Sequence, residues 1–298
     1  MTLTHLERVY FPQVGIVKAE VLQYYLEVAP YLIPHLRDRP LSLERYPEGV
    51  EGPSFYQKDA PTYFPDWLRV TSIAAAHRAK TVRHPLVDDS GGLLYLVNLG
   101  TLTLHTTLAR IDDLDHPDIL VLDIDPPAVL SGADAFRRSI EAARLLRDEM
   151  RAAGLDPLVK TSGKRGLHLG LPLDRRLTYA QVREVLGEIL AAVIARAPDR
   201  LTREARKERR GDRVYLDALR MAPGATVVPP YVVRATDNAA VSMPVEWDEL
   251  DTLEHAGAFT IRDALPRLER TGDLWASLAG AAGSGNRMEG DSQELDSE

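Results

Sequence analysis

The sequence contains no cysteine, which excludes structural disulfides and metal sites built on thiolates. It also lacks any apolar run close to the roughly 18 residues of a membrane span. Its first residues, Met-Thr-Leu-Thr-His-Leu-Glu-Arg, lack the apolar core of a secretory signal peptide. The absence of cysteine leaves the compartment open, but the absence of a membrane span and of a signal peptide predicts a cytoplasmic protein without a membrane partner.

A basic charge excess is missing as well, since the formal net charge is −8. This acidity argues against a nucleic-acid partner, because such partners favour basic surfaces. However, acidic residues dominate positions 280–298, whereas basic residues dominate positions 200–213. A solvated helix face is the ordinary explanation of such a basic run. The charge distribution is nevertheless polarised, so a nucleic-acid partner stays open.

Apolar spacing predicts helices over residues 18–36, 133–153 and 178–197. Strands are expected over 119–125, 158–161, 167–171 and 213–219, with an edge strand between 226 and 234. The central order strand–helix–strand–strand–helix–strand indicates an α+β fold with helices on one sheet face. We expect a folded domain over residues 1–279, made of an N-terminal α/β module to about residue 100 and a catalytic core over about 101–279. A disordered acidic tail is expected over 280–298.

Two aspartates end the apolar run Ile119-Leu-Val-Leu-Asp123-Ile-Asp125. Residues i and i+2 of a strand point to the same face, so both carboxylates would project together. Oxygen-rich pairs of this kind suit Mg²⁺ or Mn²⁺ bound jointly with substrate phosphates. A helix cap or a surface turn after the strand is the alternative.

A basic loop bracketed by glycines follows, Ser162-Gly-Lys-Arg-Gly-Leu-His168. Its glycines would let backbone N–H groups approach an anion closely. Ser162 supplies a hydroxyl, Lys164 and Arg165 supply charge, and His168 returns on the next strand. A basic hairpin turn with a strand histidine is the alternative.

A third aspartate, Asp217, lies in the alternating segment Arg213-Val-Tyr-Leu-Asp-Ala. A single strand aspartate can simply be solvated. As a third carboxylate it would complete a two-metal site, in which one ion activates a hydroxyl and the other neutralises a triphosphate. The three pieces together predict a nucleotidyltransferase of the primase type.

In this order, Asp-x-Asp, Ser-Gly-x-x-Gly-x-His and a strand aspartate resemble the archaeo-eukaryotic primase superfamily. More closely, the chain resembles the polymerase domain of bacterial DNA ligase D, used in non-homologous end joining. The likeness runs from Leu3-Thr-His-Leu-Glu-Arg to Tyr231-Val-Val-Arg234. It includes Arg37-x-Arg-Pro40, Glu44-Arg-Tyr-Pro-Glu-Gly-Val50 and Phe55-Tyr-Gln-Lys58. The resemblance implies a stand-alone polymerase domain whose primase-like core has an RRM-like sheet with helices.

The resemblance also implies roles for individual positions. The catalytic residues would be Asp123, Asp125 and Asp217, which with His105 would hold two Mn²⁺ or Mg²⁺ ions. The incoming NTP or dNTP would contact Ser162, Lys164, Arg165, His168 and Arg234. Gapped or broken DNA would place its 5′-phosphate on Arg8 and Lys18 and would contact Arg45, Phe55, Tyr56, Lys58 and Arg210. Without the resemblance, the aromatic pair would be taken as core. For His105, an ordinary half-buried histidine is the alternative.

Two positions depart from the pattern of ligase-linked relatives. Glu44 stands where a basic residue is common, and Lys164-Arg165 stands where Ser-Lys is usual. Nucleotide or template contacts are expected at both, so affinity or end preference is expected to change while the metal chemistry stays. No Lys-x-Asp-Gly ligase motif occurs. The chain is therefore expected to lack sealing activity and to act alone or with a separate ligase and end-binding protein.

The main prediction is a template-dependent polymerase that fills short gaps or processes ends in DNA repair and accepts ribonucleotides. De novo priming remains open. A phosphatase of the haloacid-dehalogenase group, with Asp123 as nucleophile, would need Thr or Val where Pro127 stands. A catalytically idle DNA-end-binding module is a further alternative, and the presence of all three carboxylates counts against it.

Overall fold

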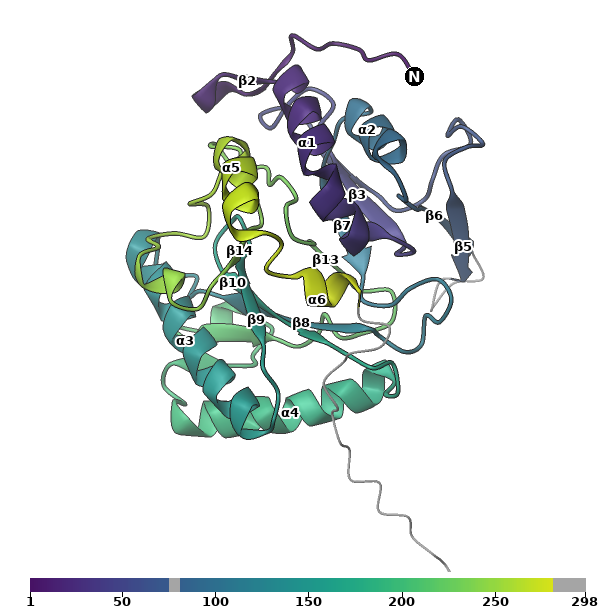
Figure 1. Ribbon diagram of the computed structural model, residues 1–298. Helices are drawn as coiled ribbons and strands as arrows, with labels where there is room; N and C mark the ends of the chain where they lie inside the picture. Colours follow the sequence, from purple (N-terminus) through teal and green to yellow (C-terminus); the bar gives the residue numbers. More distant parts are fainter. Residues whose placement is uncertain (75–80, 281–298) are drawn as a thin grey trace, which may run out of the picture.

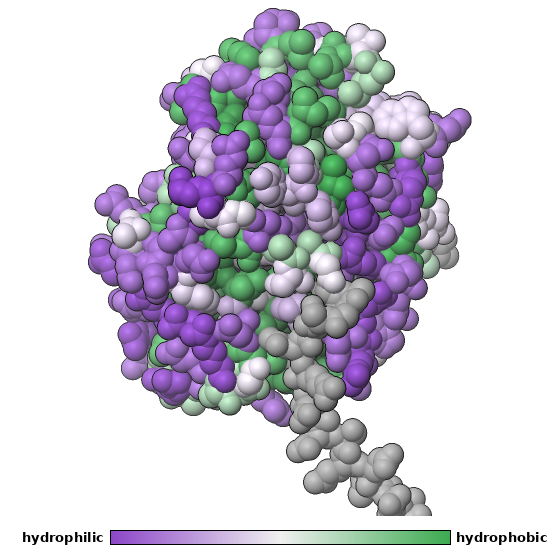
Figure 2. Space-filling view, viewed as in Figure 1, coloured by the Kyte–Doolittle hydropathy of each residue, from purple (hydrophilic) through white to green (hydrophobic). Residues whose placement is uncertain are grey.

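The computed structural model describes residues 1–74 and 81–280, and it has the α+β architecture expected from the sequence. Apart from its first residue, the predicted acidic tail lies outside the described residues. Two antiparallel-rich sheets form the body of the protein, and helices cover their outer faces (Figure 1). No helix in the described part of the chain is long and apolar enough to cross a membrane. The face seen in Figure 2 is mostly hydrophilic, with hydrophobic side chains in small groups.

The first sheet has four strands in the order β13-β7-β3-β4. They are β3 (Leu41–Arg45), β4 (Phe55–Gln57), β7 (Thr101–Thr107) and β13 (Thr226–Val227). Helices α1 (Lys18–Leu36) and α2 (Ser90–Asn98) lie against it, and the Tyr25 hydroxyl of α1 donates to the Leu102 carbonyl of β7 at 2.6 Å (Figure 1). The edge strand predicted between residues 226 and 234 is present only at Thr226–Val227, and it ends before Pro229 and Pro230. This sheet draws strands from both sides of residue 100.

The second sheet has six strands in the order β11-β12-β8-β10-β9-β14. They are β8 (Ile119–Asp125), β9 (Leu158–Thr161), β10 (Leu167–Pro172), β11 (Leu201–Thr202), β12 (Val214–Asp217) and β14 (Pro244–Val245). Helices α3 (Gly132–Ala152) and α4 (Tyr179–Arg196) pack together beneath it (Figure 1). The predicted helices and central element order are thus confirmed, with ends shifted by one or two residues.

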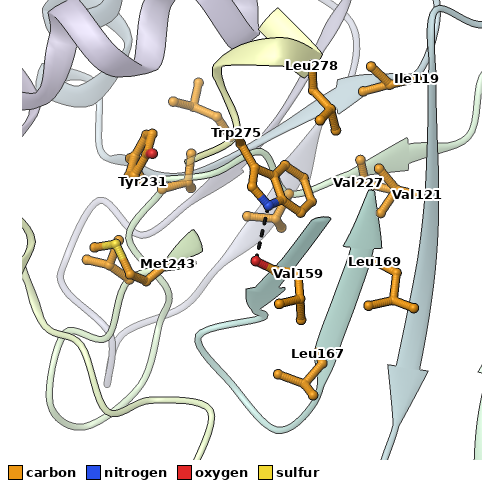
Figure 3. Close-up of a cluster of buried hydrophobic side chains, with 14 of the residues drawn as sticks. Ile119, Val121, Val159, Leu167, Leu169, Val227, Tyr231, Met243, Trp275 and Leu278 are labelled. Carbon is orange, nitrogen blue, oxygen red and sulfur yellow. Dashed lines mark hydrogen bonds between the residues drawn. The ribbon is translucent and has the colours of Figure 1, made fainter. Parts of the chain in front are cut away.

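The second sheet buries leucines against these helices and turns its other face toward the first sheet. On that other face, α6 (Ala276–Ala279) packs against β10, whereas α5 (Ile261–Thr271) packs against α1. Trp275 and Leu278 cover Gly170 of β10 so closely that an added Cβ would lie 2.7 Å from Leu278. The Trp275 indole also donates to the Val159 carbonyl of β9 at 3.1 Å (Figure 3). Trp275 and Leu278 therefore close one end of the space between the sheets.

Two buried polar clusters join the halves of the protein. The carboxylate of Asp118, just before β8, accepts two bonds from Arg39 at 2.6 and 2.7 Å and one from Arg110 at 2.7 Å. Asp273 contacts His35 of α1 at 2.8 Å and accepts from the Tyr231 hydroxyl at 2.5 Å. Because such charge-assisted bonds are directional, they fix how the two sheets face each other.

Short elements complete the fold. Two hairpins project from the first half of the chain, β1 (Val9–Phe11) with β2 (Ile16–Val17) and β5 (Val70–Ala74) with β6 (Thr81–Pro85). Single 3₁₀ turns occur at Pro12–Val14, Lys207–Arg209 and Glu249–Asp251.

Candidate active site

A row of polar residues crosses the second sheet on the face that looks toward the first sheet. The strand register places Asp217 of β12 opposite Asp123 of β8, Asp123 opposite His168 of β10, and His168 opposite Lys160 of β9. Side chains of directly opposed residues share a face. Asp125 lies two residues beyond Asp123 on the same strand and joins the same face. The sheet thus brings together the carboxylates that are separated by over 90 positions in the sequence.

The negative charge of this row is only partly compensated. Burial and the neighbouring Asp125 raise the pKa of Asp123 to about 7. Burial also raises the pKa of Asp125, against the opposing effect of Arg210, whose guanidinium lies 3.8 Å away. Arg220 approaches Asp217 at 3.5 Å. Carboxylates crowded in this way fit a site for divalent cations, which would relieve their repulsion.

The described residues do not contain a preformed cluster of three or more carboxylate or imidazole groups at metal-binding separation. His105, on β7 of the first sheet, faces the same cavity as the aspartates. Its Nε2 lies 2.8 Å from the Tyr56 hydroxyl and 3.5 Å from a Glu44 oxygen. Nε2 would have to leave these two partners before it could bind a metal.

The loop between β9 and β10 is organised around the hydroxyl oxygen of Ser162. This oxygen accepts hydrogen bonds from the backbone N–H groups of Lys164, Arg165 and Gly166 at 3.3, 3.2 and 3.0 Å. These N–H groups were expected to face an anion, but the serine oxygen occupies the position that an anion oxygen would take. These bonds use the lone pairs of the oxygen and not its O–H group. Ser162 can therefore still donate its hydroxyl proton to a ligand.

Two glycines allow the loop to pack where it does. A Cβ on Gly166 would lie 2.0 Å from the carbonyl oxygen of Ile124, between the two aspartates of β8. Gly163 has φ +72°, and its Cβ would lie 2.5 Å from the side chain of Arg234. The loop is therefore held directly against the carboxylate strand and against Arg234.

A cavity of about 570 Å³ opens between the two sheets at this point. Its walls include Asp123, Asp125, His105, Ser162 and His168, and its cationic side chains are Lys58, Lys164, Arg165, Arg220 and Arg234. Most of the residues expected to bind nucleotide and metal are thus brought together. Arg220 was not expected from the sequence; its position three residues after Asp217 was the available signal.

Arg234 and His168 hold unused hydrogen-bonding capacity inside this cavity. Nε and Nη1 of Arg234 and Nδ1 of His168 are buried without a hydrogen-bond partner among the described residues. Burial and the nearby Lys160 hold the pKa of His168 well below its usual value, so the ring is neutral near pH 7. Buried polar atoms without partners are uncommon, and in a basic cavity they indicate a binding site for an anion.

Arg8 and Lys18 lie outside the cavity, near the N-terminus. Arg8 forms an ion pair with Glu48 at 2.6 Å. Lys18 is 3% exposed, and its ammonium donates to the carbonyls of Thr4 and Asn98 at 2.8 and 2.6 Å. A DNA phosphate could reach Lys18 only after the first residues of the chain move.

The strand alternation of β4 separates the expected DNA-contacting aromatics. Tyr56 faces the cavity, whereas Phe55 points to the opposite side, where the Arg45 guanidinium lies 5.2 Å from its ring. Arg45 also donates to the Leu99 carbonyl and to Gln57. Arg210, another expected DNA contact, has its guanidinium 3.6 Å from the Tyr215 ring centre and donates to two backbone carbonyls. Its guanidinium is thus used in contacts within the protein, where it supports Tyr215 and Asp125.

The family model of the LigD primase-polymerase domain matches residues 17–275. The chain belongs to this family. A non-homologous end joining protein LigD of Pseudomonas aeruginosa is 32% identical over 93% of the chain, and one of Bacillus subtilis is 30% identical over 91%. The polymerase domain of Mycobacterium tuberculosis ligase D in complex with DNA superposes with a TM-score of 0.86 at 28% identity, covering 94% of this chain and 98% of that one.

The family confirms the resemblance found in the sequence, together with the primase-like core. As a member of the LigD primase-polymerase family, the chain is a nucleotidyltransferase. The haloacid-dehalogenase alternative loses its basis. The chain spans 33% of the length of the Pseudomonas relative and 43% of the Bacillus relative, whose further regions it does not match.

Proposed function

We propose that this protein is a template-dependent polymerase that adds nucleotides to a DNA primer in double-strand break repair, filling short gaps or processing ends, and that it accepts ribonucleotides. The observation that carries the proposal is the cavity of about 570 Å³ between the sheets, which is lined by both carboxylates and cations. Its size suits a ligand as large as a nucleotide.

The basic wall is the proposed triphosphate site. Arg234 offers two free donor nitrogens, Ser162 its hydroxyl proton, and Lys164 and Arg165 their charges. Arg165 is anchored through Nη2 to the carbonyls of Pro127 and Leu130 at 3.2 and 3.3 Å, which leaves its other nitrogens for phosphate oxygens. Donors fixed in this way bind a polyanion with little loss of side-chain entropy.

The acidic wall is the proposed metal site. Asp123, Asp125 and Asp217 would hold two Mn²⁺ or Mg²⁺ ions, which would neutralise the triphosphate and lower the pKa of the primer hydroxyl. The protein's own contribution is to keep these carboxylates on one sheet face: Asp123 and Asp125 line the cavity, and Asp217 lies opposite Asp123 on the neighbouring strand, outside the cavity lining. The primer end must then lie on the Asp217 side, because the cationic loop occupies the other side.

The proposed DNA contacts fall into two groups, one at the cavity and one near the N-terminus. Lys58 and Tyr56 face the cavity and suit a primer or template near the nucleotide, and stacking on Tyr56 is sequence-tolerant. Arg8 is the accessible candidate for a 5′-phosphate, since Lys18 is covered. The relatives' names concern non-homologous end joining. A separate ligase and an end-binding protein are therefore the proposed partners of this chain.

Primer extension on a gapped duplex tests the proposal. Wild type should extend the primer by template-directed steps with Mn²⁺ or Mg²⁺ and should stop when the metal is chelated. Asp123→Ala should abolish extension and leave DNA binding unchanged, and Asp112→Asn, which removes a carboxylate that does not line the cavity, should behave as wild type. Extension by Asp123→Ala would contradict the assignment. Dinucleotide synthesis on an unprimed template would instead favour de novo priming.

A further inference from the structure

A buried carboxylate lies beside the basic wall of the cavity. A site for a negatively charged triphosphate would not be expected to contain one. Glu44 of β3 is 8% exposed. One of its oxygens accepts from the Tyr46 hydroxyl at 2.6 Å and lies 4.0 Å from the ammonium of Lys164. The other lies 3.5 Å from Nε2 of His105. Glu44 thus contacts groups from three different elements.

The partners of Glu44 are a hydroxyl donor, an ammonium group and an imidazole, and all three favour the ionised carboxylate over the neutral acid. A negative charge beside a polyanion site weakens binding unless it organises the groups that bind the anion.

The contact between Glu44 and Lys164 bridges the cavity. Glu44 belongs to the first sheet, and Lys164 belongs to the loop between two strands of the second. The side chain of Lys164 is 38% exposed, and the positive charge of Arg234 repels its ammonium group. Without Glu44, repulsion from Arg234 and the entropy of a long side chain would both favour turning Lys164 into solvent.

We propose that Glu44 is a positioning residue for the incoming nucleoside triphosphate, because its carboxylate holds Lys164 against the cavity wall with the ammonium directed at the phosphates. The inference rests on the proposed polymerase function. It assigns to Glu44 no contact with the nucleotide itself. Its effect must therefore depend on Lys164.

A double-mutant cycle tests this dependence. Glu44→Gln keeps the size of the side chain and the bond from Tyr46, while Lys164→Met keeps the stem of the lysine. The affinity for a nucleoside triphosphate, measured without primer, and the KM and kcat of primer extension are compared for wild type, both single variants and the double variant. Asp112→Asn removes a carboxylate from an ion pair with Arg175 outside the cavity and is the matched control. Melting temperatures verify that the variants are folded.

Each single substitution should weaken triphosphate binding and raise KM by about tenfold, with a smaller change in kcat. The double variant should be no worse than Lys164→Met alone, because the two residues act as a unit. Lys164→Arg, which keeps the charge, should stay within a few fold of wild type.

Two outcomes would overturn the inference. Tighter triphosphate binding by Glu44→Gln would show that the carboxylate only repels the ligand. Effects that multiply in the double variant would show that Glu44 acts independently of Lys164. If wild type binds triphosphate but does not extend a primer, the polymerase function fails while the binding cycle still decides the role of Glu44. If it binds no triphosphate, both proposals fail.

Discussion

Replacement of Gly166 by alanine tests how the loop and the carboxylate strand depend on each other. The new Cβ would lie 2.0 Å from the Ile124 carbonyl oxygen and 3.1 Å from its carbon, both backbone atoms that cannot rotate away. Either the loop or β8 must therefore move by more than an ångström. We expect the free energy of unfolding to fall by about 2 kcal/mol, as in overpacked cores.

The same shift should displace the carboxylates of Asp123 and Asp125, since Ile124 lies between them in the strand. A displacement of about 1 Å at a reacting centre can cost on the order of a hundredfold in rate, so primer extension should fall at least tenfold. Urea unfolding and single-nucleotide insertion kinetics measure the two effects.

Gly187, in the middle of α4, provides the matched control. The atom nearest to a Cβ added at Gly187 would be Nη1 of Arg203 at 3.8 Å, so the methyl group fits. Gly187→Ala should stabilise the protein by about 0.5–1 kcal/mol, because alanine loses less conformational entropy in a helix, and should leave insertion unchanged. A Gly166→Ala protein with wild-type stability and rate would refute the packing argument.

Three further predictions concern single side chains. Arg165→Ala should raise the KM for the triphosphate about tenfold and spare affinity for gapped DNA; collapse of DNA binding with an unchanged KM would assign the loop to the DNA path. A 5′-phosphate at the gap should strengthen binding, and Arg8→Ala should reduce this gain, more so at low salt; a gain that Arg8→Ala leaves intact would move the phosphate site elsewhere. Asp273→Asn should destabilise the fold by about 2 kcal/mol near pH 7. Burial by itself would raise the pKa of Asp273, but the hydrogen bond with His35 holds this pKa below its usual value. The carboxylate therefore stabilises the fold above about pH 4, and its contribution is lost as pH falls further. A difference between Asp273→Asn and wild type that persists unchanged at pH 2 would contradict that linkage.

The chemistry-bearing motifs were readable from the sequence because each depends on local spacing. Asp123 and Asp125 share a face because strands alternate, and the helix over 18–36 follows from its apolar spacing despite two internal prolines. The family likeness was visible for the same reason, since its motifs are short and ordered along the chain.

What the side chains actually touch was decided by the tertiary structure. Lys18 and Ser162 illustrate this: the lysine is covered by the N-terminal residues, and the serine oxygen takes the amide hydrogens expected for phosphate. The alternation of β4 sends Phe55 and Tyr56 to opposite sides, although they are adjacent in sequence.

The sequence by itself determined the identity of the polar groups, their strands and loops, and the family, because these depend on residue type and local periodicity. Only the tertiary structure decided which groups meet across the cavity. Glu44 and Lys164 are 120 positions apart, one on a strand of the first sheet and the other in a loop of the second, so no local pattern could pair them. Their contact depends on how the two sheets pack, which is set by long-range burial and by the ion cluster around Asp118.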